Sequence, residues 1–466
     1  MKPSTIVKVF AAVVAVLLAL CFIYPRDGIK IAGHYYYYPS MRSLVDDEQH
    51  DLELSVKTMP AEIVELSDSV AYYRTLVSDG ALRFWLPDSS YLDAFWQRAE
   101  EAQGKNTVLR VLHYGDSQIE MDHITSRLRS YLQATFGGGG PGMVPVSPVV
   151  PSPTVLHGSE GDLEYLASFG DSNTIRSYGN YGVMMQSFRL NGSAITTLRA
   201  SRTSGVDERA MTFADVRLVY NNRGSLRATL TRKGGNQPME RDGAAGVGSM
   251  VWHLDAPTSS LRLSLSGSAD LYCITVDNGA GVAVDNIPMR GCSGQQFTQS
   301  RRDLLTAAYQ QLDVGLIIMQ FGGNSVPYLD SSEEIARYCS ALGKQIDHLH
   351  RCCPDARILF VGPSDMSTRV RGQLQTYPIM SELIDSLSTM ALRHDAAFWS
   401  IYHAMGGANS MPQWADQGLA GKDYIHFSQR GADLMGDRMA EAFDNSYQLF
   451  CLQRRLNRYY QENKQR

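Results

Sequence analysis

The stretch VLRVLHYGDSQIE, residues 108–120, contains the transition that decides the fold. Its first six residues are mostly apolar and partly β-branched, which predicts a buried strand. The strand runs into the small turn Gly115-Asp116-Ser117, and a helical pattern follows, with Ile124, Leu128, Tyr131 and Leu132 on one face. Open α/β sheets are built from such units and place their active sites at the carboxyl ends of the strands. Ser117 is therefore either a helix-capping residue or a hydroxyl presented at a functional edge.

The same alternation of strands and helices returns after Pro288. Apolar runs predict strands, and periodic runs between them predict helices; the strands are Val314–Phe321, Ile358–Val361 and Ala396–Ile401, and the helices are Glu333–Leu349 and Ile379–Arg393. Alternating elements of this kind indicate a parallel sheet with helices on both faces. We therefore expect an α/β fold with a three-layer, doubly wound parallel sheet.

The segment between about residues 144 and 286 has a different character, rich in Ser, Gly, Thr and Asn. Its short alternating runs are Val183–Arg189, Val216–Tyr220, Leu226–Thr231, Met250–Leu254, Leu261–Leu265 and Tyr272–Val276, and Asn221–Gly224 reads as a turn between two of them. This pattern predicts an antiparallel β-sandwich inserted into the α/β domain.

The N-terminus predicts a membrane anchor. Lys2 and Lys8 precede an apolar run, Val9–Tyr24, and Pro25-Arg26 follows it. We favour an uncleaved single-pass anchor over a cleaved signal or a buried helix. The lysines would then stay inside, and the chain beyond Pro25 would lie outside the cytoplasm, in the periplasm if the anchor spans a bacterial inner membrane.

These patterns divide the chain into consecutive parts. We expect a transmembrane anchor (1–25), a stalk with a helical lead-in (26–105), a discontinuous α/β domain (106–143 and 287–450), the inserted sandwich (144–286) and a basic, solvated helix end (451–466). The run Tyr35–Tyr38 in the stalk fits a packed strand, an aromatic belt near a membrane or a sugar-stacking surface.

Composition limits the classes of partner and cofactor. With 44% hydrophobic and 20% charged residues the chain is a folded protein, and its formal charge of -5 argues against nucleic acid as the main partner. The seven cysteines show no metal-ligand spacing; Cys273 and Cys292 fit either a disulfide or two buried thiols. The run Gly137–Gly142 lacks the Lys-Ser/Thr pair of a phosphate loop and predicts only a flexible helix exit. No cofactor is expected.

Four loops of the α/β domain carry groups suited to acyl transfer. They are Gly115–Ser117, Arg290–Gly294, Gly322–Asn324 and Asp423–His426. A serine hydroxyl needs a neighbouring base, which His426 could supply while Asp423 orients its ring. The backbone N–H groups of Ser117 and Gly294, with the side-chain amide of Asn324, could hold the oxyanion.

Other interpretations of these residues stay open. Gly291 could replace Gly294, and Asn324 could be only a turn residue. Asp423 and His426 could bind a metal, although no second His or Cys pair at ligand spacing supports this. Asp116 fits a role in shaping the turn rather than in the reaction.

The four blocks GDS, SG, GxN and DxxH, in this order, resemble the SGNH (GDSL-type) hydrolase superfamily over residues 106–137 and 287–445. The resemblance implies Ser117 as nucleophile, Asp423 and His426 as the rest of a triad, and Gly294 and Asn324 in the oxyanion hole. A β-sandwich between the serine block and the glycine block is a further resemblance, to the bacterial peptidoglycan O-acetylesterases. Their inserted domain is similar to a carbohydrate-binding module. The stretch of residues 113–125, HYGDSQIEMDHIT, also resembles membrane-anchored members of the superfamily. In those proteins the serine block usually continues with Glu-Gly-Asp, whereas here Met121 stands in place of the glycine.

The resemblance implies an esterase that removes acyl, above all acetyl, groups from an acetylated cell-envelope polysaccharide such as peptidoglycan. A polysaccharide O-acetyltransferase would use the same triad and would have a membrane-bound O-acyltransferase as partner. A non-catalytic glycan-binding scaffold is the third hypothesis.

Overall fold

The computed structural model describes residues 29–31, 34–36, 60–170, 179–202, 205–232 and 238–464. The predicted anchor and most of the predicted stalk lie outside these ranges. Of the tyrosine run, Tyr35 and Tyr36 belong to β2 (His34–Tyr36), which pairs antiparallel with β1 (Ile29–Ile31). Within the described ranges, no helix is long and apolar enough to cross a membrane.

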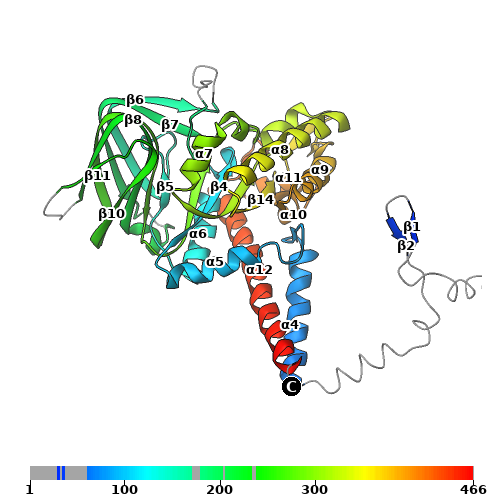
Figure 1. The fold of residues 1–466 in the computed structure, drawn as a ribbon. Coiled ribbons are helices and arrows are strands. Elements are labelled where there is room, and N and C mark those ends of the chain that lie inside the picture. Colours follow the sequence, from blue (N-terminus) through cyan, green and yellow to red (C-terminus); the bar gives the residue numbers. More distant parts are fainter. Residues whose placement is uncertain are drawn as a thin grey trace, which may run out of the picture. The chain divides into compact units, whose positions relative to one another are not determined.

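A six-stranded sheet with the order β12-β4-β13-β14-β17-β3 forms the centre of residues 72–454, which make one compact unit (Figure 1). Its parallel strands are β4 (Val108–Gly115), β12 (Gly281–Pro288), β13 (Asp313–Gln320), β14 (Arg357–Gly362) and β17 (Ala397–Ser400). The predicted α/β class is confirmed. Two features were not predicted: β3 (Phe84–Trp85) adds an antiparallel edge, and β12 begins inside the range expected for the insert.

Helices cover both faces of this sheet because side chains alternate along its strands. On β4, Leu112 and Tyr114 join a core that includes residues of α7 (Arg302–Tyr309), α8 (Ser332–Cys352) and α9 (Met380–Arg393). His113 points the other way, toward Thr125 on α6 (His123–Phe136). On that face Trp96 of α5 (Asp93–Gly104) stacks on Phe136 of α6.

Shorter and terminal elements complete the described chain. They are α4 (Ala61–Ser78), α10 (Ile401–Met405), α11 (Ser410–Asp416), α12 (Gln429–Lys464), the 3₁₀ turns η1 (Ser117–Ile119), η2 (Glu208–Met211), η3 (Phe297–Gln299) and η4 (Gly323–Tyr328), and a hairpin of β15 (Ser367–Val370) with β16 (Gln373–Thr376). The predicted basic tail is the last part of α12.

The inserted β unit is a seven-stranded antiparallel sheet that stands beside the α/β helices in Figure 1. Its strands are β5 (Gly142–Val144), β6 (Val155–Ala167), β7 (Gln186–Ala200), β8 (Phe213–Arg232), β9 (Met239–Asp242), β10 (Gly246–Thr258) and β11 (Ser260–Asp277). Instead of the two facing sheets of a sandwich, all seven strands belong to one hydrogen-bonded network.

Two predicted breaks inside the insert are wrong. Residues 221–224 form no turn but continue β8, and the two runs expected between 261 and 276 are both parts of β11. The reason is a glycine at the close contact of these strands: Gly267 has a φ of +129°, and a Cβ there would lie 2.0 Å from the carbonyl oxygen of Ser225. Glycine thus lets two long strands stay paired where they bend.

Candidate active site

Three of the predicted site residues lie in a hydrogen-bonded line at the carboxyl edge of the sheet. The Oγ atom of Ser117 is 2.9 Å from Nε2 of His426. Nδ1 of His426 is 2.8 Å from Oδ2 of Asp423. The His426 and Asp423 side chains are each 48% exposed, so solvent and substrate can reach the imidazole. A hydroxyl, an imidazole and a carboxylate in this order can generate a nucleophile and return its proton to a leaving group.

The loop that carries Asp423 and His426 is a tight turn closed by its own backbone. The N–H of Gly421 donates to the carbonyl of His426 (2.8 Å), and Tyr424 takes a φ of +55°, which is uncommon for a non-glycine residue. Oδ1 of Asp423 accepts the backbone N–H groups of Ile425 (3.1 Å) and His426 (3.2 Å). Burial acts to raise the pKa of Asp423, but these bonds and the His426 ring outweigh it and lower the pKa, so the carboxylate stays ionised.

Ser117, the predicted nucleophile, lies at the start of η1, and its turn is held from both sides. Oδ1 of Asp116 accepts the N–H of Gln118 (3.0 Å), and the Asp116 N–H donates to the carbonyl of Gln320 on β13 (3.3 Å). A Cβ at Gly115 would meet the Ile119 side chain at 2.9 Å, so the turn needs a glycine there. The cap of this turn is Asp116, so the interpretation of Ser117 as a capping residue is wrong, and its hydroxyl contacts His426 instead.

The structure also brings the predicted oxyanion residues to this edge. Nδ2 of Asn324 donates to the carbonyl of Cys292 (3.0 Å) and to Oδ2 of Asp116 (3.3 Å), so Asn324 lies between the nucleophile turn and the glycine loop. Gly294 has a φ of +85°, and a Cβ there would approach the Phe321 ring to 2.9 Å, whereas a Cβ at Gly291 would meet open space. Close packing requires glycine at 294, although both positions have positive φ.

Asp116 is buried beneath this arrangement. Burial raises its pKa to about 6, against the hydrogen bond from Gln118 and the nearby His426, which both act to lower it. Within the described residues no lysine or arginine pairs with Asp116. Its contacts with Gln118 and Asn324 fit the predicted role in shaping the turn.

Gln118 is a site residue whose role the sequence did not reveal. Its Nε2 donates to the carbonyl of Ile425 (2.7 Å), and its Oε1 accepts the N–H of Phe427 (3.4 Å). These bonds bracket His426 from both sides and tie the histidine loop to the nucleophile turn. Only the position of Gln118 next to Ser117 could have hinted at this.

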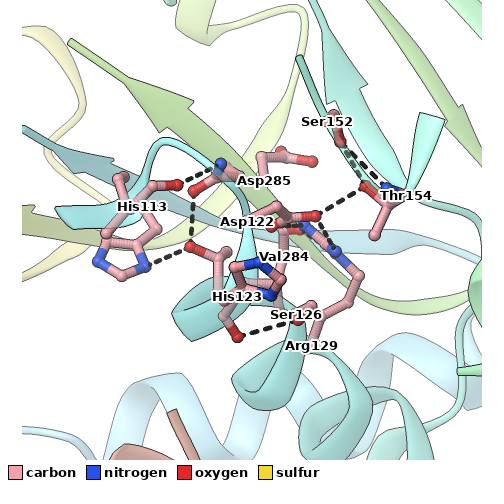
Figure 2. A network of polar contacts seen from close by, with 12 residues as sticks. His113, Asp122, His123, Ser126, Arg129, Ser152, Thr154, Val284 and Asp285 are labelled. Atoms are coloured by element: carbon pink, nitrogen blue, oxygen red, sulfur yellow. Dashed lines mark hydrogen bonds and ion pairs between the residues drawn. The ribbon is translucent and has the colours of Figure 1, made fainter. Parts of the chain in front are cut away.

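A buried chain of polar groups supports the nucleophile turn from inside the sheet (Figure 2). Asn286 Nδ2 donates to the carbonyl of Ile119 (2.9 Å), the Thr125 hydroxyl donates to Asn286 Oδ1 (2.7 Å), and Thr125 Oγ1 is 2.9 Å from His113 Nδ1. A hydroxyl has one proton, and Thr125 donates its proton to Asn286. The Thr125 oxygen must therefore accept a hydrogen bond from the Nδ1–H of His113. Burial lowers the pKa of His113 to about 4, so the ring is neutral and its Nε2 is an acceptor.

The side-chain amide of Gln320 ends this chain. Its Oε1 lies 3.0 Å from His113 Nε2, while its buried Nε2 has no hydrogen-bond partner among the described residues. Rotating the Gln320 amide by 180° places its NH₂ group, a donor, against the acceptor Nε2 of His113. The O and N positions of Asn and Gln amides are assigned from such hydrogen-bond partners. The chain then connects β13, which leads to Asn324, with the carbonyl of Ile119 in the nucleophile turn.

The catalytic hollow above the triad has a volume of about 190 Å³. Ser117, His426 and Asn324 line it together with apolar side chains, among them Pro327, Tyr328, Met366 and Ile425. Among the described residues, no group of three or more His, Cys, Asp and Glu side chains is placed to hold a metal ion. Cys273 and Cys292 are two separate buried thiols, and burial raises the pKa of Cys273 to about 12.

Comparison with solved structures gives a likeness that extends over more than three quarters of the chain. A peptidoglycan O-acetylesterase matches with a TM-score of 0.62 and 23% identity, over 78% of this chain and 98% of that one. This likeness shows a shared fold, including the extra β-sheet.

Two other solved structures match weakly. A carbohydrate esterase family 2 enzyme with a carbohydrate-binding domain from Corynascus thermopiles (Myceliophthora fergusii) has a TM-score of 0.26 and 13% identity, over 61% of this chain and 99% of that one. A family two carbohydrate esterase from Clostridium thermocellum has a TM-score of 0.26 and 10% identity, over 61% and 98%. These scores are too low to carry an argument.

No curated protein sequence matches the chain. The model of the GDSL-like Lipase/Acylhydrolase family matches residues 268–434, which contain Gly294, Asn324, Asp423 and His426. Ser117 lies outside this match because the inserted β sheet separates it from the other blocks. The predicted resemblance to the SGNH (GDSL-type) hydrolases is thereby confirmed: residues 268–434 of this chain match the GDSL-like lipase/acylhydrolase family, a family of ester hydrolases.

Proposed function

We propose that this chain is a serine O-acetylesterase that removes acetyl groups from an O-acetylated glycan of the cell envelope, such as peptidoglycan. The observation that carries the proposal is the line of Ser117, His426 and Asp423, with contacts of 2.9 and 2.8 Å, at the open edge of an ester-hydrolase fold. The fold likeness to a peptidoglycan O-acetylesterase supports the choice of glycan.

In the first half-reaction Ser117 Oγ attacks the ester carbonyl while His426 Nε2 accepts the hydroxyl proton. Asp423 keeps the ring oriented and stabilises the imidazolium that forms. The carbonyl oxygen becomes an oxyanion, for which the N–H groups of Ser117 and Gly294 and the amide of Asn324 are the proposed donors. When the tetrahedral intermediate collapses, His426 returns the proton to the glycan oxygen, and the acetyl group remains on Ser117.

In the second half-reaction water attacks the acetyl-enzyme. His426 now takes a proton from water, the same donors stabilise the second oxyanion, and acetate leaves as Ser117 regains its proton. The 48% exposure of His426 favours this step, because water can reach the imidazole. Both half-reactions use backbone and side-chain groups of the chain together with water.

The cellular setting is part of the proposal. We infer from the sequence that residues 1–25 anchor the protein in the inner membrane and that the catalytic part lies in the periplasm. An envelope glycan would be within reach there. The formal charge of -5 fits a partner other than nucleic acid.

The test uses detergent-solubilised full-length protein and O-acetylated peptidoglycan. We expect free acetate to appear and the acetylated muropeptides to disappear in mass spectra, with neither change for Ser117→Ala. A parallel reaction contains an unacetylated glycan acceptor. Acetate on the acceptor instead of in solution would identify a transferase, and glycan binding without either product would identify a scaffold.

A further inference from the structure

A second, larger cavity lies beside the nucleophile turn, where the inserted sheet meets the α/β domain. Its volume is about 300 Å³, and its lining comes from both parts of the chain. Glu120, Asp122 and Arg290 belong to the α/β side, and Thr154, His157 and Gln186 belong to the insert.

This cavity begins one turn away from the catalytic serine. The N–H of Glu120 donates to the carbonyl of Ser117 (3.3 Å). Arg290 follows Met289, whose N–H donates to the carbonyl of Gly115 (2.7 Å), and Nε of Arg290 is 3.0 Å from Oε2 of Glu120. The cavity and the hollow at Ser117 have no lining residue in common, and the turn of residues 117–120 separates them.

The polar wall of the cavity is rigid (Figure 2). Asp122, with a φ of +58°, receives two bonds from Arg129 (2.8 and 3.0 Å) and one from the Thr154 hydroxyl (2.8 Å). Arg129 Nε also donates to the carbonyl of Val284 (2.7 Å). These three polar side chains are all buried, and their mutual bonds fix the wall before any ligand arrives.

The charges that line the cavity cancel. Its two acids, Glu120 and Asp122, face its two arginines, Arg129 and Arg290. Burial lowers the pKa of His157 to about 4, so this side chain is neutral near pH 7. A strongly ionic ligand would find no opposite charge in excess, and the cavity suits a neutral molecule.

Most of the remaining surface is apolar. Val149, Val150, Phe169 and Met184 line the cavity opposite polar groups such as Gln186 and Asn286. Asn286 already has protein partners, so the ion pair of Glu120 and Arg290 offers the polar contacts. An acyl chain would displace water from this pair without replacing its hydrogen bonds, whereas a sugar offers apolar C–H faces and hydrogen-bonding edges at once. A volume of about 300 Å³ is at the small end of the range for ligand sites, which suits a small unit rather than a long oligomer.

We propose that this cavity binds a neutral N-acetylated sugar residue of the same glycan whose ester lies at Ser117, on the other side of the turn. The inference rests on the proposed glycan esterase function. The acetamido methyl group and the ring faces would pack on the valines and Phe169, while the amide and hydroxyl groups would reach the polar wall. The insert thereby supplies half of a subsite.

The experiment measures binding of N,N′-diacetylchitobiose, which carries no ester, by titration calorimetry. Full-length Ser117→Ala protein is the parent, so that turnover plays no part. Val150→Trp, added to the parent, fills the cavity and should weaken binding at least 10-fold. Leu156→Trp is the matched control: Leu156 is 49% exposed on β6 outside the cavity, and its variant should bind within 2-fold of the parent.

Thermal unfolding shows whether each variant is folded. If Val150→Trp does not fold, Val149→Trp takes its place, because Val149 is 39% exposed and can accept a larger side chain. Unchanged binding by a folded cavity variant, or no binding by the parent at millimolar sugar, overturns the subsite. Absence of acetate release by the wild-type protein overturns the esterase proposal instead, and disaccharide binding by the parent would then still stand.

Discussion

The catalytic hollow and the second cavity lie on the two sides of one short turn, yet they are built in opposite ways. The hollow has about 190 Å³ and half-exposed catalytic side chains held by loop backbone. The cavity has about 300 Å³ and a wall of buried, paired charges between two domains. The difference fits the two proposed tasks: proton transfer needs groups that water can reach, whereas recognition gains from groups that are already fixed.

The two regions also treat a buried carboxylate differently. Asp122, at the cavity, is bonded to the Arg129 guanidinium through two contacts. Among the described residues, the carboxylate of Asp116, at the hollow, accepts only from neutral donors, the Gln118 N–H and the Asn324 amide. A buried carboxylate whose donors are all neutral, such as that of Asp116, holds its proton more readily than an exposed one.

The largest expected effect separates chemistry from binding. Ser117→Ala should lower turnover of an aryl acetate by at least about 10⁴-fold, because removal of a triad nucleophile leaves only the oxyanion donors. Disaccharide binding in the second cavity should persist. Initial rates and calorimetry on the same protein check both; substantial turnover by the variant would contradict the nucleophile assignment.

A smaller loss should follow when an oxyanion donor is removed. Asn324→Ala should lower kcat about 100-fold, since the developing charge loses one hydrogen bond. Circular dichroism and initial rates with an aryl acetate are the measurements. Asn463→Ala, on the exposed end of α12, serves as control and should keep the wild-type rate. A kcat for Asn324→Ala equal to that of the control would remove Asn324 from the site.

The unpaired carboxylate of Asp116 predicts a pH dependence of stability. Its pKa is about 6 in the folded protein and near 3.8 when exposed, so the folded state binds more protons between these values. The contribution of Asp116 to stability should therefore fall as the pH rises from about 4 to about 6, by roughly 2 to 3 kcal/mol. Asp116→Asn should flatten this slope in urea unfolding series at several pH values. An unaltered slope would show that another group is responsible.

The smallest expected effect concerns the wall of the second cavity. Thr154→Val removes the hydroxyl that bonds to Asp122 and should lower the free energy of unfolding by about 1 to 2 kcal/mol. Urea unfolding measures this change. Ser152→Ala removes a hydroxyl that contacts the Thr154 hydroxyl but leaves the bond from Thr154 to Asp122 in place, so it should lower the free energy of unfolding by less. If Thr154→Val were as stable as the wild type, the wall would not be the rigid element inferred here.

Much of the fold could be predicted because its signals are local. Apolar runs mark β4, β13, β14 and β17, and the periodic runs mark α6, α8 and α9. The edge strand β3 is two residues long and has no such signal. The predicted turn at 221–224 was wrong because whether the sequence Asn-Asn-Arg-Gly turns or continues a strand depends on the partner strand, here β11 with Gly267.

By itself, the sequence determined which groups meet at the catalytic edge: parallel strands bring their carboxyl ends together, and so Ser117, Asn324, Asp423 and His426 could be grouped from the order of four motifs. Only the tertiary structure decided the supporting partners. Gln118 at the histidine loop, the chain from His113 to Asn286, and the cavity between insert and turn all join side chains distant in sequence. Their distances depend on packing and register, which no local pattern contains.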